Sequence, residues 1–279
     1  MNIDDLSIII VTWNGDGILL DCLDSLRQVY GTRPEVIVVD NAATASTRSI
    51  CDGYENVRYV ESPGNPGFAG GNNRGLEQVS RPYVLLLNND TVVCHDSFTP
   101  LIEFLDAHDK AGIAQGVMEI PGFGLDDCGV MMTPFGIQRH LFRGKQLSEV
   151  RLAPRKVFAA KGAMLMFKRA LLKDVGGFLF YDHFKSYYEE TDFCHRARNA
   201  GWETWFVPTP PIKHLCGATS TRFPLRDIWT QYIANTLYSF HRNYGFWGHV
   251  FTLPCFACAA MIKAPRAFLG ALRLNAKRS

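Results

Sequence analysis

The sequence predicts an α/β protein built on a doubly wound, mostly parallel sheet flanked by helices, with a helical appendage at the C-terminal end. Two observations lead to this fold class. Apolar runs at 6–13, 35–41 and 83–89 have no polar face, which is typical of strands covered on both sides. Segments that indicate helices lie between these runs. Alternating strands and helices predict a wound sheet with right-handed crossovers.

The first half of the chain supplies four of the expected strands and two helices. Leucines 19, 20, 23 and 26 recur at helical spacing and predict a helix over 17–29, after the break at Asn14-Gly15-Asp16. A second helix is expected to start within GNNRGLEQVS (71–80). The four strands are LSIIIVTW (6–13), EVIVVDN (35–41), VRYVE (57–61) and YVLLLNN (83–89).

The second half gives weaker signals. Glycine and proline are frequent from 112 to 160, where short strands and loops are expected. KGAMLMFKRALLKDVGGF (161–178) predicts a short strand and then a helix over 169–175. The other expected elements are a helix at 187–201, a strand at 202–208 and a helix at 226–243.

Positive charge is concentrated near the C-terminal end. The formal net charge is +2, but no Asp or Glu follows Asp227, so the tail carries +6 and the body −4. Such a segment predicts an anionic surface as partner. The apolar stretch 246–262 is short for a membrane span, and a helix after it would place Arg266, Arg273 and Lys277 on one side. We expect contact with a membrane surface; packing on its own domain, or on a second subunit of a homodimer, is the alternative.

The eight cysteines are scattered, and the N-terminal MNIDDLSIIIVTW has acids where a secretory signal would be basic. Free thiols in a reducing, cytoplasmic compartment are therefore expected. Cys255 and Cys258 form a C-x-x-C pair, with neither a second pair at zinc-site spacing nor a βαβ context. A metal or redox role for this pair is disfavoured.

Polar residues cluster at the expected C-terminal ends of three strands: Thr12-Trp13-Asn14, Asp40-Asn41 and Asn88-Asn89-Asp90. Ligands of wound sheets bind beyond these ends. A single Asn or Asp there is more simply a turn residue, but three such groups in one sheet predict a ligand site. Asp90 has two interpretations: a ligand of a hard divalent cation whose other ligands are substrate phosphates, or a cap of the next turn.

Three further features suit either structure or chemistry. SPGNPGFAGGNNRG (62–75) holds five glycines, which suit turns or the approach of backbone N–H groups to an anion, but matches neither G-x-G-x-x-G nor a P-loop. Glu189-Glu190-Thr191-Asp192 puts acids at a helix start, which either complements the helix dipole or supplies a base of raised pKa. His214 is expected to be structural unless the fold brings it to Asp90.

These features, in this order, resemble the family-2 glycosyltransferases of the GT-A fold, particularly their bacterial rhamnosyltransferase-like branch. The resemblance covers residues 7–220 and implies a catalytic domain over 1–220, followed by a helical, basic segment over 221–279. The matching segments are SIIIVTWNG, LLDCLDSL, EVIVVDNAA, NPGFAGGNNRG, VLLLNNDTVV, KGAMLMFKRALLKDVGGF, YYEETDFCHRARNAGW and IKHLCGATS.

The resemblance also implies roles for individual residues. Asn88-Asn89-Asp90 resembles this branch's form of the D-x-D motif, so that Asp90, together with His214, would bind Mn²⁺ or Mg²⁺ on the donor's diphosphate. The residues implied to lie near the donor's nucleoside or sugar are Thr12, Trp13, Asn14, Asp40, Asn65, Gly67 and Asn73.

The family's catalytic base is usually the second acid of an E-D pair, which here is Glu190 of Glu189-Glu190. Glutamate reaches further than aspartate, which leaves Glu189 and Asp192 as alternatives. Lys161 stands where relatives often carry a small hydroxyl residue, before Gly162. This position borders the expected acceptor site, and Lys161 is expected to contact an acceptor phosphate.

The implied reaction is a single inverting displacement in bacterial surface polysaccharide synthesis, at the inner face of the plasma membrane. A sugar, with dTDP-rhamnose favoured as donor and UDP-linked hexoses as the alternative, moves to a hydroxyl of a glycan or lipid-linked glycan. No nucleic-acid partner is indicated. A nucleotidyltransferase would want a basic, glycine-rich signature where TWNGDG is acidic. A non-catalytic nucleotide- or glycan-binding relative is the other alternative, and the presence of Asp90, Glu190 and His214 argues weakly against it.

Overall fold

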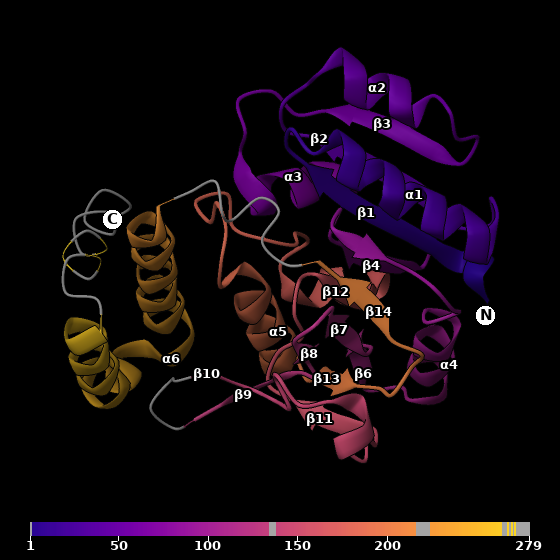
Figure 1. Ribbon diagram of the computed structural model, residues 1–279. Helices are drawn as coiled ribbons and strands as arrows, with labels where there is room; N and C mark the ends of the chain where they lie inside the picture. Colours follow the sequence, from indigo (N-terminus) through magenta and orange to yellow (C-terminus); the bar gives the residue numbers. More distant parts are fainter. Residues whose placement is uncertain are drawn as a thin grey trace.

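The computed structural model describes residues 2–133, 138–215 and 224–263, together with 267, 269 and 271. The first half of the chain alternates strands and helices, as expected (Figure 1). Its strands are mutually parallel, and all four predicted strands are confirmed to within two residues at each end. The elements are η1 (Ile3–Asp5), β1 (Leu6–Thr12), α1 (Asp16–Tyr30), β2 (Glu35–Asp40), α2 (Ala45–Cys51), β3 (Val57–Glu61), α3 (Gly67–Leu76) and β4 (Tyr83–Leu87).

Helix α3 begins at Gly67, earlier than the start expected at 71. The reason is close packing of this helix on the sheet. A Cβ at Gly71 would lie 2.6 Å from Val11 Cγ1, and a Cβ at Gly75 would lie 2.5 Å from Ile9 Cγ2. Two of the glycines in the 62–75 segment therefore serve the contact between helix and sheet rather than a loop.

The second half of the chain extends the sheet beyond β4. Strand β12 lies antiparallel between β4 and β6, β13 is parallel to β6, and β11 closes that edge. The elements are β5 (Thr91–Val92), α4 (Thr99–Ala107), β6 (Ala111–Gln115), β7 (Met118–Ile120), β8 (Gly124–Asp127), β9 (Val130–Met132), β10 (Gln138–His140), η2 (Leu147–Glu149), β11 (Arg155–Val157), β12 (Met164–Lys168), η3 (Arg169–Val175), α5 (Glu189–Asn199), β13 (Glu203–Phe206), β14 (Ile212–His214) and α6 (Leu225–Lys263).

The complete large sheet has the order β11-β13-β6-β12-β4-β1-β2-β3, and most of its neighbouring strands are parallel, as predicted. Helices cover both of its faces. Leu23 of α1 and Leu101 of α4 belong to the core on one face, and Ala69 of α3 and Phe193 of α5 belong to the core on the other. Burial on both faces explains why the strands read as continuous apolar runs. The segment predicted as a helix over 169–175 is the 3-10 helix η3.

A smaller sheet, β5-β14-β7-β8, brings distant segments together just beyond the end of β4. His214 of β14 pairs with Thr91 of β5, and the N–H of Leu215 donates to the carbonyl of Asp90 at 2.9 Å. Strand β8 is the far edge of this sheet and ends at Asp127. The small sheet therefore collects residues from about 90, 126 and 214 at one place.

Helix α6 confirms the helix predicted at 226–243 and continues to Lys263, with Pro254 inside it. It packs beside α5 (Figure 1). Ile233, Leu237 and Phe240 form a separate apolar cluster on α6, together with Ala267 and Ala271. The C-terminal helical appendage of the predicted fold is thus confirmed.

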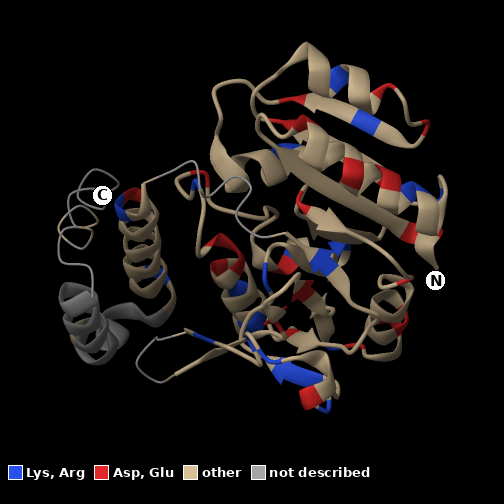
Figure 2. Cartoon of the chain, viewed as in Figure 1, with Lys and Arg blue, Asp and Glu red and all other residues tan. Residues whose placement is uncertain are grey.

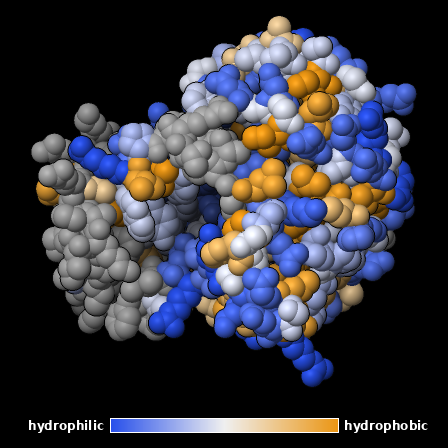
Figure 3. Space-filling view, in the orientation of Figure 1, coloured by the Kyte–Doolittle hydropathy of each residue, from blue (hydrophilic) through white to orange (hydrophobic). Residues whose placement is uncertain are grey.

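The basic face predicted at Arg266, Arg273 and Lys277 lies outside the described residues. Within the described part of the chain, none of the helices combines the length and hydropathy of a membrane-spanning segment. Apolar residues are scattered in small groups over the face seen in Figure 3. The exposed ones include Leu225 and Trp229 on the first turns of α6.

Candidate functional site

The ends of β1 and β4 meet through their polar residues. Asn89 Nδ2 donates to Thr12 Oγ1 at 3.0 Å, and the N–H of Asn88 donates to the carbonyl of Ala163 at 3.1 Å. A Cβ at Gly15 would lie 2.8 Å from Asn89 Nδ2, so a glycine is needed where helix α1 starts beneath this contact. Asn88 and Asn89 thereby fix the backbone that carries Asp90.

The fold brings His214 to Asp90. His214 Nε2 lies 3.2 Å from Asp90 Oδ1, and both side chains are buried. The contact with His214 Nε2 is an ion-pair distance without hydrogen-bond geometry, so Asp90 Oδ1 has no hydrogen-bond partner in the described part of the chain. Asn88 Nδ2 lies 3.3 Å from the same imidazole nitrogen. The sequence analysis expected His214 to be structural unless the fold brought it to Asp90, and the structure places the two side chains together.

Asp126, which the sequence analysis did not single out, holds the other side of His214. Its Oδ2 lies 2.7 Å from His214 Nδ1 and accepts a hydrogen bond from Lys161 Nζ at 2.5 Å. Arg143 binds the other carboxylate oxygen and donates to the Asp126 carbonyl at 2.9 Å. Burial alone would raise the pKa of Asp126, but His214 and the cationic Lys161 outweigh it and lower that pKa.

The residues at this place fit a divalent cation held jointly with substrate phosphates. A metal-binding His commonly donates its second ring N–H to a carboxylate, as His214 does toward Asp126. Asp90 Oδ1 is a buried oxygen without a hydrogen bond, as a ligand atom would be. Among the described residues, no three Asp, Glu, His or Cys side chains are arranged to hold a cation alone. Oxygen atoms of a diphosphate would have to supply the remaining ligands.

Glu189 and Glu190 open helix α5, whose acids gather at this end (Figure 2). The Oε2 atom of each is buried without a hydrogen-bond partner among the described residues. Burial raises the pKa of both side chains. The charge of Glu190 raises the pKa of Glu189 further, whereas Lys161 and His140 partly counter the rise at Glu190. Glu190 is therefore the member of the pair that ionises first.

Gly162 connects this acid pair to the cation pocket. A Cβ at Gly162 would lie 3.9 Å from the Cβ of Glu190 and 3.1 Å from the ring of Phe68. The neighbouring Lys161 reaches Asp126, the partner of His214. One short segment thus lies between the acids of α5 and the pocket of Asp90, which brings both to one edge of the sheet.

Residues 7–176 match the sequence model of glycosyl transferase family 2, which is more than half of the chain. The chain belongs to this family. The match includes Asp90, Asp126 and Lys161, whereas Glu190 and His214 lie beyond its C-terminal limit.

Two curated family-2 relatives illustrate the extent of the similarity. The chain is 30% identical over 206 residues to the low-salt glycan biosynthesis hexosyltransferase Agl10 of Haloferax volcanii, covering 70% of this chain and 62% of Agl10. It is 26% identical over 176 residues to the poly(ribitol-phosphate) β-N-acetylglucosaminyltransferase TarS of Staphylococcus aureus, covering 60% of this chain and 28% of TarS. The chain therefore spans less than two thirds of the length of either relative.

Solved structures confirm the GT-A fold. GalNAc-T7 with UDP, GalNAc and Mn²⁺ matches with a TM-score of 0.69 at 14% identity, over 94% of this chain and 53% of that one. The mannosyltransferase PcManGT of Pyrobaculum calidifontis, in complex with GDP-Man and Mn²⁺, matches with a TM-score of 0.58 at 17% identity, over 96% and 79%. TarS 1-349 of S. aureus with UDP-GlcNAc gives 0.60 at 17%, over 93% and 73%. The rhamnosyltransferase-like branch stays a prediction.

Other residues predicted to lie near the donor are found around the ends of β1 and β2. Asp40 is buried and accepts hydrogen bonds from the N–H groups of Ala42 (2.9 Å) and Thr44 (2.7 Å), which fixes the turn after β2. Trp13 and the exposed Asn14 follow β1, and Asn14 has a left-handed backbone (φ 52°). Their contacts with a donor stay a prediction.

The segment before α3 is shaped by its contact with the turn before α5. Asn65 is left-handed (φ 46°) and accepts a hydrogen bond from the N–H of Gly67 at 3.3 Å. Gly67 is also left-handed (φ 82°), and a Cβ there would collide with the backbone of Lys185. Asn73 bonds the backbone of Phe180 in both directions, at 2.8 and 3.0 Å. Asn73 thus fastens the loop that leads to Glu190.

Asp192 is occupied by structural contacts. Its carboxylate accepts hydrogen bonds from Arg196 Nε at 3.0 Å, Ser239 Oγ at 2.8 Å and Asn243 Nδ2 at 2.9 Å. The contact with Arg196 lies within α5, and those with Ser239 and Asn243 join α5 to α6. We therefore leave Asp192 out of the proposed chemistry.

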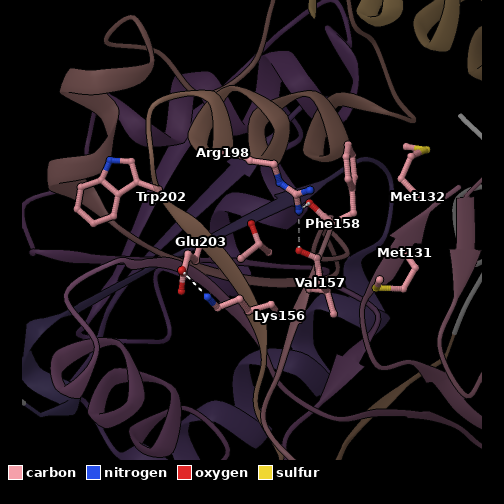
Figure 4. A pocket seen from close by; sticks show the side chains of 9 residues that line it. Met131, Met132, Lys156, Val157, Phe158, Arg198, Trp202 and Glu203 are labelled. Atoms are coloured by element: carbon pink, nitrogen blue, oxygen red, sulfur yellow. Dashed lines mark hydrogen bonds and ion pairs between the residues drawn. The ribbon is translucent and has the colours of Figure 1, made fainter. Parts of the chain in front are cut away.

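A cavity of about 330 Å³ lies elsewhere in the molecule (Figure 4). Arg198 donates to the carbonyl of Val157 at 2.9 Å on one side, and Lys156 pairs with Glu203 at 2.6 Å on another. Arg198 is eight residues beyond Glu190 on α5, roughly 12 Å along the helix axis. None of the residues that line the cavity was predicted to bind or react: Met131, Met132, Lys156, Val157, Phe158, Arg198, Trp202, Glu203 and Thr204.

Proposed function

We propose that the chain is a cation-dependent inverting glycosyltransferase that moves a sugar from a nucleoside-diphosphate donor to an acceptor hydroxyl. One observation carries the proposal: Glu190, a half-buried residue whose Oε2 atom is buried and whose pKa is raised, is linked through Gly162 and Lys161 to the pocket of Asp90 and His214. A base and a diphosphate-binding pocket at one sheet edge are the two parts that the reaction needs.

The proposed donor pocket lies at the ends of β1 and β4. Asp90 and His214 would hold Mn²⁺ or Mg²⁺, and the bound cation would stabilise the negative charge of the departing diphosphate. Asp126 orients the imidazole of His214 through its Nδ1, and Lys161 and Arg143 neutralise Asp126. The structures of GalNAc-T7 and PcManGT, which share the fold, contain Mn²⁺, which supports a divalent cation at this site.

Glu190 would accept the proton of the acceptor hydroxyl. The acceptor oxygen then attacks the anomeric carbon, the bond from that carbon to the phosphate oxygen breaks, and the nucleoside diphosphate leaves. A buried carboxylate with raised pKa is a stronger base than an exposed one, which suits this step. We prefer Glu190 over Glu189 because Lys161 and His140 partly counter the rise in the pKa of Glu190, whereas the charge of Glu190 raises the pKa of Glu189 further.

The finer identity of the substrates rests on the resemblance. The rhamnosyltransferase-like motifs favour dTDP-rhamnose, although the similar structures contain UDP-GlcNAc or GDP-Man. Curated relatives are named for glycan and wall-polymer synthesis, which supports a glycan or lipid-linked glycan acceptor. Lys161 would lie beside an acceptor phosphate. Contact of the basic tail with the inner face of the plasma membrane and a homodimer belong to this proposal as well.

A screen of sugar nucleotides tests the proposal. Thermal unfolding with Mn²⁺ and dTDP-rhamnose, UDP-glucose, UDP-GlcNAc or GDP-mannose should reveal the donor, because binding to the native state raises the melting temperature. Slow release of the nucleoside diphosphate from that donor should then require Mn²⁺ or Mg²⁺. Binding without any turnover would favour a non-catalytic relative, and release of pyrophosphate would favour a nucleotidyltransferase.

A further inference from the structure

The turn before helix α5 has an unusual backbone. Tyr187 (φ 71°) and Tyr188 (φ 75°) are consecutive left-handed residues, and neither is a glycine. This conformation is unfavourable for residues other than glycine, so it persists only where neighbouring groups hold it. Glu189 and Glu190 follow directly. The position of the proposed base therefore depends on whatever holds this turn.

One residue of α6, Asn235, forms hydrogen bonds with this turn. Asn235 is fully buried, and its Nδ2 donates to the carbonyls of Ser186 at 2.9 Å and Tyr187 at 2.6 Å. Its Oδ1 accepts a hydrogen bond from Gln231 Nε2 at 3.0 Å, which fixes the orientation of the amide. Both N–H groups of the Asn235 amide therefore donate to carbonyls at the strained pair, one just before it at Ser186 and one inside it at Tyr187.

Further contacts hold the turn on both sides. The ring of Tyr188 packs edge-on against Tyr232 and Phe240 of α6, with centroid distances of 6.0 and 6.4 Å. On the opposite side, the N–H of Ala69 in α3 donates to the carbonyl of Lys185 at 3.2 Å. The turn is therefore clamped between the helix beside the donor pocket and the C-terminal helix.

We propose that Asn235 is a positioning residue for sugar transfer: it holds the strained turn so that Glu190 faces the acceptor. This inference rests on the proposed function of Glu190. Helix α6 lies beyond the region matched by the family model, and this inference gives it a role in supporting the active site. Only the amide of an asparagine or glutamine offers two N–H donors and one acceptor without a charge, and Asn235 uses all three.

The control for this role is Ser239→Ala. Ser239 is also buried on α6, and its hydroxyl donates to Asp192 of α5 at 2.8 Å without touching the turn. Each variant removes hydrogen bonds between α6 and the α5 region, so both should lower the melting temperature. Only Asn235→Leu, which keeps the volume of the side chain but has no donor, releases the carbonyls of Ser186 and Tyr187.

Hydrogen exchange of the full-length protein measures how well the backbone of the turn is held, and it needs no substrate. Asn235→Leu should speed the exchange of amides over 185–190, whereas Ser239→Ala should leave them protected. Asn235→Ser, which keeps one donor and should fold if the leucine variant does not, should give an intermediate rate. Unchanged protection in both Asn235 variants would overturn the inference.

Kinetics test whether the turn acts through Glu190. Asn235→Leu should lower kcat for release of nucleoside diphosphate roughly 100-fold, as expected for a misplaced catalytic group, with little change in the donor KM. Ser239→Ala should stay close to wild type. Adding Asn235→Leu to Glu190→Gln should cost nothing more, because the base is already absent.

Two results would contradict this role: an equal loss of kcat in Ser239→Ala, or independent losses that multiply in the double variant. The inference and the function on which it rests fail differently. A wild-type protein that turns over no sugar nucleotide contradicts the proposed function. An active wild type with an equally active Asn235→Leu contradicts the inference alone.

Discussion

The two halves of the molecule treat their polar groups differently. At the ends of β1 and β2, hydrogen bonds hold Thr12, Asn89 and Asp40: Asn89 donates to Thr12, and Asp40 accepts from the turn that follows it. Among the described residues, buried oxygens without a hydrogen-bond partner occur in both halves, at Asn41 and Asp90 in the first and at Glu189 and Glu190 in the second. The first half is mainly a frame of parallel strands, whereas the second half places two such carboxyls side by side at the start of α5, which is unfavourable for folding.

This difference indicates where the chemistry lies. A carboxylate such as Asp40 is held in one orientation by its hydrogen bonds. A buried carboxyl with raised pKa takes a proton more readily than an exposed one. The cation pocket combines both arrangements, because Asp126 anchors the imidazole of His214 while Asp90 Oδ1 has no hydrogen-bond partner among the described residues. The four predictions below test this contrast.

The largest effect is expected for Glu190→Gln. The amide cannot take the proton of the acceptor, so turnover should fall roughly 10²–10⁴-fold, the usual contribution of a general base. Affinity for the nucleoside diphosphate with Mn²⁺, measured by calorimetry, should change little, since Glu190 is proposed to face the acceptor rather than the donor. Loss of nucleotide binding in this variant would move Glu190 into the donor pocket and contradict its role as base.

Asp126→Asn should have the next largest effect, on cation affinity. The asparagine keeps the shape but removes the charge that orients His214, and loss of such a partner typically weakens metal binding 10–100-fold. Mn²⁺ binding in the presence of dTDP or UDP, followed by electron paramagnetic resonance, measures this directly. Asp90→Ala should weaken binding at least as much.

Asp127→Asn is the matched control for this prediction. The neighbouring Asp127 is equally buried, but its carboxylate contacts His140 and not His214. It should therefore keep the Mn²⁺ affinity of the wild type. Equal weakening in both variants would show that the region, rather than the orientation of His214, sets the affinity.

The sequence predicted the frame better than the site. Runs such as LSIIIVT consist almost entirely of apolar residues, which indicates a strand buried on both faces. Strand β1 and its parallel neighbours were therefore predictable. The start of α3 was not, because Gly71 and Gly75 are helix residues that suit close packing on the sheet, which no local pattern distinguishes from a loop. Helices α2 and α4, absent from the predicted elements, pack on the sheet without a strong local signal.

Within the site, the residues with a motif were found and those without one were missed. Asp90, Glu190 and His214 belong to recognisable segments. Asp126 lies in a stretch where glycines and short strands hide any periodicity, and its contact with His214 exists only because the small sheet brings β8 and β14 together. Asn235 is one polar residue in a helical pattern, and its role depends on the strained turn opposite it.

Gly75→Ala tests the rigidity of the frame. The added methyl would lie 2.5 Å from Ile9 and 3.1 Å from Val39, so either the helix or the strands must shift. Overpacking of this kind costs about 1–3 kcal/mol, and the better helix propensity of alanine returns up to about 1 kcal/mol. The net loss should lower the melting temperature by a few degrees, with kcat reduced only slightly.

Gly17→Ala is the control for this packing argument. Gly17 lies in helix α1 with no atom within 4 Å of a Cβ at that position. The same exchange should stabilise the protein there, because alanine favours the helix and narrows the unfolded ensemble. A destabilised Gly17→Ala, or a stabilised Gly75→Ala, would contradict the close contact of α3 with the sheet.

The smallest effect, and one of opposite sign, is expected for Glu189→Gln. The pKa of Glu189 is raised in the folded protein, so between the unfolded pKa and that raised value only the unfolded chain releases its proton. The free energy of unfolding therefore has its full value below the unfolded pKa. It falls as pH rises, by about 1.4 kcal/mol for each pH unit between the unfolded and the folded pKa. Glutamine does not ionise, so the variant should melt higher than wild type at pH 8 and by a smaller margin at pH 5. Its amide brings buried donors of its own, which keeps the gain to a few degrees.

Thermal unfolding at both pH values measures this gain, with Glu103→Gln on the exposed side of α4 as the matched control. A gain that is the same at pH 5 and pH 8 would mean that ionisation of Glu189 is not what destabilises the folded state. If the predicted pH dependence is found, the acid pair reduces stability where it is proposed to supply reactivity. The well-packed strands of the first half would then offset the unfavourable burial of Glu189 beside Glu190, the proposed base.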